Sequence, residues 1–176
     1  MPKQVLFIQG GGEGAFREDA TLAASLRSSL GPAYDVRYPA MPDEGDPDYK
    51  SWKRIILHEA AEMGEGAVLV GHSIGASVLI RIFADGDPKP AIAGMFLIAG
   101  PFWHEHDFWR WDEVALPKDA AGRYPRDVPL FLYHGDKDEV VPVSHLDMYV
   151  RAFPQAVVRR LQGRNHQLND ERTEVA

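Results

Sequence analysis

The residues with the clearest chemical potential lie at positions 71–75, where the sequence reads GHSIG around Ser73. Apolar residues at 67–70 precede this segment, and a helix-like stretch follows it. A Gly-x-Ser-x-Gly segment between a strand and a helix is typical of a nucleophile elbow, because the glycines leave room for a sharp turn that exposes the serine hydroxyl. The pattern predicts that Ser73 is a nucleophile. A tight turn that carries an incidental serine is the alternative.

A nucleophilic serine needs a histidine to take its proton and a carboxylate to orient that histidine. After such an elbow, the acid is expected to follow a later strand and the histidine to lie near the end of the chain. His166 follows the last expected strand, and both Asp136 and Asp138 follow the strand before it. We expect Asp138 to orient His166, because Asp138 precedes the segment that returns the chain to the next helix. Asp136 lies beside Gly135 and suits a turn better.

Four other histidines receive simpler interpretations. His58 and His145 fall within helix-like patterns, and we expect them on the solvated surface. His72 and His134 adjoin strand ends, where we expect packing or local hydrogen bonds.

An oxyanion hole should combine the N–H after the nucleophile, that of Ile74, with one from the loop after the first strand. That loop contains a run of glycines at 10–12, whose backbone can approach an anionic oxygen without side chains in the way. Gly11 is the expected donor, and we expect its neighbour Gly12 to contact the substrate.

The same loop formally matches a dinucleotide-binding fingerprint, with Gly10, Gly12 and Ala15 at the required spacing. That fingerprint also needs an acidic residue at the carboxyl end of the second strand to bind the ribose. The only acid of the expected second strand, Asp35, stands at its beginning. This mismatch disfavours nucleotide binding.

The segment 101–129 fits no strand–helix unit and contains three of the four tryptophans. It follows a strand, so we expect it to overhang the same sheet edge as Ser73, with Phe102, Trp103 and Trp109 lining the substrate pocket. The alternative is that these aromatic side chains pack into a small core.

Metal binding is a second interpretation of this segment, through His104, His106 and Asp107. A metal site would require a further ligand, and the sequence places none nearby. We therefore predict no metal site.

Short apolar runs alternate with amphipathic stretches along the chain. Helices are expected at 18–30, 48–63 and 144–153, where Ser144 is the expected N-cap. Strands are expected at 5–9, 35–38, 67–71, 95–99, 130–133 and 157–161. This alternation predicts an α/β fold, with a mostly parallel sheet of about six strands and helices on both faces. In such sheets, ligands bind beyond the carboxyl ends of the strands.

The composition limits the classes of function. A length of 176 residues suits one domain, spanning residues 1–176. A net charge of −7 argues against nucleic acid as a partner, and the absence of cysteine excludes disulfides and thiolate metal sites. The longest mostly apolar stretch, 91–103, is too short to cross a bilayer, and no signal peptide is evident. We expect a cytoplasmic protein without a membrane partner.

The segments 7–12, 71–75, 138–142 and 163–166 together resemble the α/β-hydrolase superfamily. The resemblance covers nearly the whole chain and is greatest to the small serine-hydrolase branch that includes retinoblastoma-binding protein nine and bacterial relatives. It implies a triad of Ser73, Asp138 and His166, oxyanion amides of Gly11 and Ile74, and no cofactor. A Leu-x-Cys-x-Glu partner motif cannot exist without cysteine, so retinoblastoma binding is not expected.

These observations predict a serine hydrolase that cleaves a small carboxylic ester, or an amide or thioester, through an acyl-enzyme. The expected partner is a small acyl substrate. The alternative is a non-catalytic binding module that holds a partner with its aromatic loop. Neither the substrate nor the oligomeric state follows from the sequence.

Overall fold

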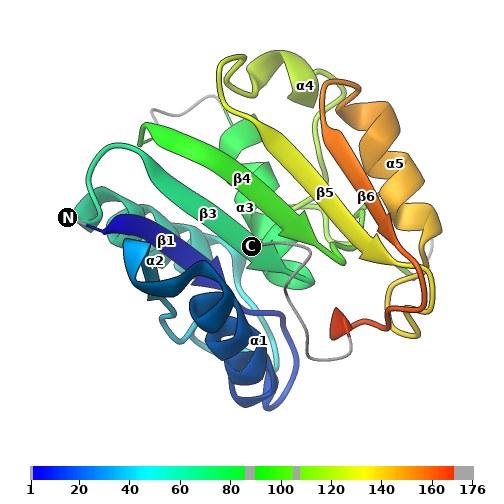
Figure 1. Ribbon diagram of the computed structural model, residues 1–176. Helices are drawn as coiled ribbons and strands as arrows, with labels where there is room; N and C mark the ends of the chain where they lie inside the picture. Colours follow the sequence, from blue (N-terminus) through cyan, green and yellow to red (C-terminus); the bar gives the residue numbers. More distant parts are fainter. Residues whose placement is uncertain (1, 86–89, 105–107, 169–176) are drawn as a thin grey trace.

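A computed structural model describes residues 2–85, 90–104 and 108–168 of the chain (Figure 1). Its centre is one six-stranded sheet in the order β2-β1-β3-β4-β5-β6, and all five neighbouring pairs are parallel. The strands are β1 (Lys3–Ile8), β2 (Tyr34–Arg37), β3 (Ala67–His72), β4 (Ile92–Ile98), β5 (Leu130–Gly135) and β6 (Val157–Leu161). The parallel six-stranded sheet expected from the sequence is thus confirmed.

The helices of the described residues largely follow the expected amphipathic stretches. They are α1 (Ala15–Leu30), α2 (Tyr49–Glu62), α3 (Ile74–Ala84), α4 (Ala120–Arg123) and α5 (Ser144–Ala152), with a 3₁₀ turn η1 (Gly31–Ala33) after α1. The side chain of Asp48 caps α2 by accepting from the N–H of Ser51 at 2.8 Å. The expected cap of α5 is wrong: Val143 occupies the N-cap position, and Ser144 is already helical.

Helices cover both faces of the sheet, as Figure 1 shows. On one face, α2, α3 and α5 contribute buried residues such as Trp52, Leu79 and Leu146 to the larger core cluster. On the other face, α1 contributes Leu22 and Leu26 to a smaller cluster. This arrangement leaves the carboxyl ends of β1, β3, β5 and β6 free to carry loops along a common edge, where the candidate site lies.

Candidate active site

Ser73 lies in the turn that joins β3 to α3, directly after the buried strand. Its backbone has φ 52° and ψ −122°, in a region that residues with a side chain rarely adopt. A Cβ atom on Gly71 would lie 2.7 Å from the Ala76 backbone, and one on Gly75 would lie 2.3 Å from the Gln9 carbonyl oxygen. Glycine at both positions therefore permits the tight approach of β3, α3 and the loop after β1. The elbow holds Ser73 in a strained conformation at the sheet edge.

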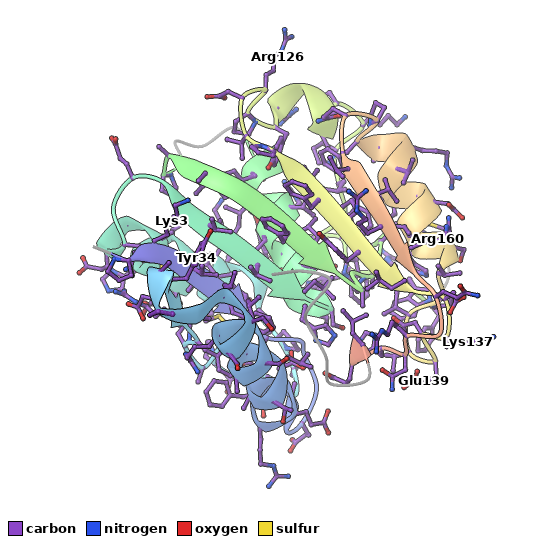
Figure 2. All side chains as sticks on the ribbon, viewed as in Figure 1. Lys3, Tyr34, Arg126, Lys137, Glu139 and Arg160 are labelled. Carbon is purple, nitrogen blue, oxygen red and sulfur yellow. The ribbon has the colours of Figure 1, made fainter. Side chains whose placement is uncertain are left out.

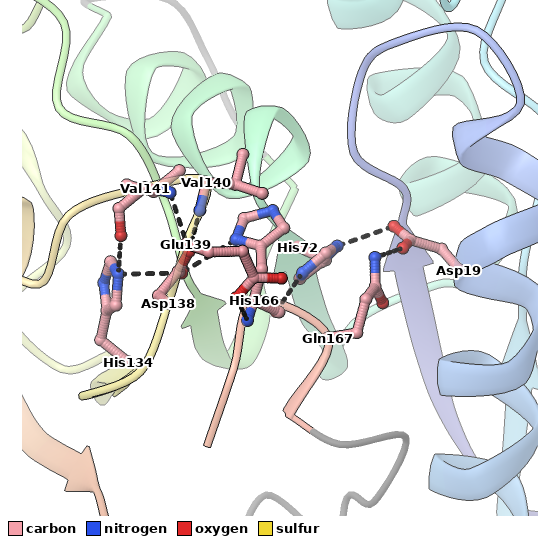
Figure 3. A network of polar contacts seen from close by, with 9 residues as sticks. All are labelled: Asp19, His72, His134, Asp138, Glu139, Val140, Val141, His166 and Gln167. Carbon is pink, nitrogen blue, oxygen red and sulfur yellow. Dashed lines mark hydrogen bonds and ion pairs between the residues drawn. The ribbon is translucent and has the colours of Figure 1, made fainter. Parts of the chain in front are cut away.

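Asp138 is the carboxylate that the structure brings to His166. Its Oδ2 lies 2.8 Å from His166 Nδ1 and 3.1 Å from His134 Nε2. Figure 3 marks both contacts with dashed lines. Its Oδ1 accepts from the N–H groups of Val140 and Val141, at 2.9 and 2.8 Å. Burial of this fully enclosed side chain raises its pKa, but the hydrogen bonds from His134 and His166 hold the pKa well below its usual range. Asp138 is therefore ionised and fixed in orientation.

Asp136, the other candidate, has a different task. Its Oδ1 accepts from the N–H of Gly163 at 2.7 Å, and its side chain is exposed. Asp136 thus ties together the loops after β5 and β6 as a turn-forming residue.

Ser73 and His166 line the same small pocket, whose volume is about 150 Å³. Both residues are largely buried, with exposed fractions of 8% and 7%. Among the residues that the structure describes, no hydrogen bond joins the Ser73 hydroxyl to the imidazole, and His166 Nε2 has no other partner. Such a contact is often long in an enzyme without substrate and tightens when substrate binds. His166 Nε2 is thus available to a proton from within this pocket.

Of the two proposed oxyanion donors, Gly11 lines the same pocket, and Ile74 directly follows Ser73 in the chain. A Cβ on Gly11 would lie 2.6 Å from Ile74 Cδ1, which shows how closely the loop after β1 approaches the elbow. Within the described part of the chain, neither the Gly11 nor the Ile74 amide donates to an acceptor. The Gly12 amide, in contrast, donates to the Glu44 carbonyl oxygen, and Gly12 is not among the lining residues.

The remaining histidines depart in part from expectation. His58 is exposed, as expected. His145 is 3% exposed, so the expectation of a surface position is wrong. The reason is that α5 turns it toward the segment after β4, where its Nδ1 accepts from the Phe102 N–H at 2.8 Å and its ring lies 4.8 Å from that of Trp109. Burial lowers the pKa of His145, in keeping with a neutral ring that accepts a hydrogen bond.

His134 and His72 also differ from each other. His134 Nε2 lies 2.9 Å from the carbonyl oxygen of Val141, a local contact. His72 reaches far along the chain instead, since its Nδ1 lies 2.8 Å from Asp19 Oδ2, 53 residues away. His72 is packed in the interior, as one half of the expectation had it, but its hydrogen bonds are not local, so the other half is wrong.

The aromatic segment forms a packed cluster. The ring of Trp103 lies 5.7 Å from that of Trp109 and 5.5 Å from that of Trp111, both edge-on, and the ring of Phe102 lies 5.0 Å from that of Tyr149. None of these aromatic residues lines the pocket of Ser73. The substrate-binding role of Phe102, Trp103 and Trp109 stays a prediction.

Of the three candidate metal ligands in this segment, His106 and Asp107 lie outside the described residues, and only His104 lies within them. No group of three histidine, aspartate or glutamate side chains within the described ranges could hold a metal ion.

A scan against protein-family models finds no match, and a search of curated proteins finds none either. Solved structures do resemble this one. A bromoperoxidase from Bacillus anthracis is 15% identical, with a TM-score of 0.68 over 96% of this chain and 87% of that chain. A 2-hydroxy-6-oxo-6-phenylhexa-2,4-dienoate hydrolase from Rhodococcus sp. strain RHA1 is 14% identical, with a TM-score of 0.72 over 95% of this chain and 85% of that chain. The esterase domain of a Rhodothermus marinus protein is 15% identical, with a TM-score of 0.66 over 97% of this chain and 82% of that chain.

The chain has the α/β-hydrolase fold. At these identities the likeness concerns the fold, and the site must be argued from its own residues. In this α/β-hydrolase fold, Gly11, Ser73, Asp138 and His166 follow four different strands of one sheet and meet at its carboxyl edge. No helix of the described residues is long and apolar enough to span a membrane.

Sequence reasoning missed two acidic residues at this edge of the α/β-hydrolase fold. Asp19 is 1% exposed and contacts His72. The signal for it was its spacing, because Asp19 shares a helical stripe with Leu22 and Leu26 and thus faces the core.

Glu44 is the second missed residue. Its carboxylate accepts from the Gln9 side chain at 2.7 Å, from the Gly14 N–H at 2.8 Å and from the Phe16 N–H at 2.7 Å, which fixes the loop between β1 and α1. These hydrogen bonds hold the pKa of Glu44 below its usual range. In the sequence, the only signal for Glu44 was that it follows β2, whose carboxyl end lies at the same edge of the sheet.

Proposed function

We propose that this protein is a serine hydrolase that transfers an acyl group to water through Ser73, His166 and Asp138. One observation carries the proposal: a strained serine at a glycine-flanked elbow shares a pocket with a histidine whose Nδ1 contacts a buried, ionised aspartate. A binding module has no need to keep a serine in a strained conformation beside an oriented imidazole.

In the proposed reaction, Ser73 Oγ attacks the acyl carbonyl carbon while His166 Nε2 takes the hydroxyl proton. The carbonyl oxygen becomes an oxyanion that accepts from the amides of Gly11 and Ile74. The intermediate collapses, the leaving alcohol receives the proton from His166, and the acyl group stays on Ser73. Water then attacks the acyl-enzyme by the same route. Asp138 holds the tautomer in which Nε2 can accept, and stabilises the imidazolium that forms.

The proposed substrate is a small carboxylic ester, or an amide or thioester of similar size. A pocket of about 150 Å³ around Ser73 favours a compact acyl group. We also propose, from the sequence, that the chain belongs to the small serine-hydrolase branch and acts in the cytoplasm without a cofactor.

Labelling with a fluorophosphonate, together with turnover of p-nitrophenyl acetate, tests the proposal. We expect a single label on Ser73, and loss of both label and turnover in Ser73→Ala. The matched control is Ser144→Ala, the same substitution at an exposed serine at the start of α5, which should keep both. A folded wild-type protein that neither labels nor turns over would favour the binding module instead.

A further inference from the structure

A second histidine–carboxylate pair, Asp19–His72, lies directly beside the proposed triad. Asp19 and His72 are each 1% exposed, and His72 Nδ1 lies 2.8 Å from Asp19 Oδ2. The rings of His72 and His166 are 4.8 Å apart between centroids. Figure 3 shows the pair on the side of His166 away from Asp138. The proposed reaction does not use it, so its burial requires another explanation.

Asp19 joins three segments that are far apart in the sequence. Its Oδ2 accepts from the Gly10 N–H at 2.7 Å as well as from His72, and its Oδ1 accepts from the Gln167 side chain at 3.1 Å. Gly10 precedes the proposed oxyanion donor, His72 precedes the nucleophile, and Gln167 follows the proposed base. One carboxylate thus holds the neighbours of all three reacting groups.

His72 connects the Asp19 carboxylate to the main chain of His166. Its Nε2 lies 3.0 Å from the His166 carbonyl oxygen, so it contacts the main chain of the residue whose side chain contacts Asp138. The backbone of His166 is fixed from one side and its ring from the other.

The groups that contact the His72 ring limit where its protons can lie. One ring nitrogen faces a carboxylate and the other faces a carbonyl, and both of these groups only accept. If both contacts are hydrogen bonds, each ring nitrogen donates, and His72 is an imidazolium paired with the Asp19 carboxylate. Burial raises the pKa of Asp19, but the charge and hydrogen bond of His72, together with the hydrogen bonds from Gly10 and Gln167, lower it overall, so Asp19 is ionised.

We infer that Asp19 and His72 form a charged positioning pair, which aligns the His166 main chain and the Gly10 loop with Ser73 through the contacts described above. This inference rests on the proposed hydrolase function for its effect on rate, and on the geometry alone for the protonation of His72. Asp19 and His72 also line the pocket of Ser73, but the hydrogen bonds that carry the inference run to residues next to the reacting groups.

Asp19→Asn removes the negative charge of the Asp19 side chain and keeps its size and shape. The amide oxygen can still accept from Gly10, but without the carboxylate the doubly protonated His72 loses its balancing charge, so only one of the two His72 hydrogen bonds survives. We expect kcat to fall by about 10- to 100-fold with KM changed by less than about 3-fold, because misplacement of a reacting group by a fraction of an ångström has effects of this size. His72→Gln, which retains one side-chain donor, should give the same split.

The matched control is Asp85→Asn. Asp85 is a carboxylate of the α3 terminus that contacts Tyr49 and Lys53, each at 2.7 Å, far from the pocket. We expect Asp85→Asn to lower the melting temperature and leave kcat unchanged. If Asp19→Asn also lowers only the melting temperature, or raises only KM, the positioning role is wrong.

Nitrogen-15 NMR of the histidine rings gives a readout that needs no activity. At about pH 7.5, both His72 nitrogens of the wild type should show the signature of N–H groups, and this signature should disappear in Asp19→Asn. A neutral His72 in the wild type overturns the inference even if the protein is an active hydrolase. If Ser73 neither labels nor turns over a substrate, the proposed function fails, and the ring spectrum still decides the state of the pair.

Discussion

Asp136 and Asp138 offer a matched comparison, because they lie two residues apart and only one of them contacts His166. Asp138→Asn should lower kcat by about 10³- to 10⁴-fold, since the amide favours the tautomer whose Nε2 cannot accept the serine proton. Asp136→Asn retains an acceptor for Gly163 and should change kcat by less than about 3-fold. Steady-state kinetics of both variants with p-nitrophenyl acetate check this ranking, and the reverse ranking would assign the role to Asp136.

The low pKa values of Asp19 and Asp138 also affect stability in acid. A carboxyl group with a lowered pKa in the folded state stabilises the fold above its unfolded pKa, about 3.9, and this contribution is lost as pH falls through the folded pKa. The free energy of unfolding should therefore fall steeply below about pH 4.

Urea titrations of the wild type and Asp138→Asn at about pH 5, 4 and 3 measure this effect. Because a protonated carboxyl resembles the amide, the two proteins should differ most at pH 5 and converge as pH falls. A constant difference across this range would contradict the assignment of an ionised Asp138.

The sequence alone could indicate which residues lie at the site where their order after successive strands was enough to place them. The order of Ser73, Asp138 and His166 indicated groups that the structure brings to one edge of the sheet. Asp19 was harder, because its contact with His72 joins α1 to the end of β3 and depends on how the two pack. The surface position expected for His145 was wrong, because the helical pattern of α5 does not tell which of its faces the segment after β4 covers.

At the scale of elements, the aromatic segment after β4 is predicted to limit the acyl pocket. Trp103 packs against two other indoles, and its Nε1 is buried without an acceptor in the described part of the chain. If the segment limits the acyl pocket, Trp103→Ala or Trp109→Ala should shift the preference toward longer acyl chains. The expected change is about 1–3 kcal/mol per methylene.

A series of p-nitrophenyl esters of increasing acyl length measures this shift as kcat/KM, alongside thermal melts of each variant. Trp111→Ala is the control, because Trp111 belongs to the same cluster but is not predicted to contact substrate. A lower melting temperature with an unchanged length profile would make the segment part of the core.

The start of helix α2 follows the N-capping rule and could be predicted from the sequence. Asp48 precedes the amphipathic stretch, and its side chain accepts from the Ser51 N–H. Asp48→Ala should lower the free energy of unfolding without changing kcat, whereas Asp48→Asn should lower it by less because it keeps the acceptor. Chemical denaturation of the two variants checks the difference. The missing cap at Ser144 shows the limit of such rules, since the N-cap of α5 lies one residue earlier, at Val143.

At the scale of the whole molecule, β6 is an edge strand of the sheet and carries Arg159 and Arg160, both exposed. Figure 2 shows Arg160 at this edge, where it pairs with Asp147 of α5. Charged side chains on an edge strand oppose pairing with the edge of another molecule. Replacing both arginines by valine should therefore promote aggregation, although the net charge moves from −7 to about −9 and opposes association.

Light scattering during slow heating compares this double variant with Lys118→Val/Arg126→Val, which removes the same charge from exposed positions away from β6. Earlier aggregation only in the β6 variant supports the edge effect. Equal behaviour of the two variants would assign the effect to charge or apolarity alone.

The positive φ of Ser73 affects how the thermal stability of this protein could be raised. Glycine adopts such a conformation without strain, so Ser73→Gly should relieve about 1–3 kcal/mol. A library selected for heat resistance alone would thus enrich glycine at position 73 and discard the proposed nucleophile. Stability and the proposed chemistry therefore compete at one backbone torsion, and a selection for stability must also score activity to retain the serine.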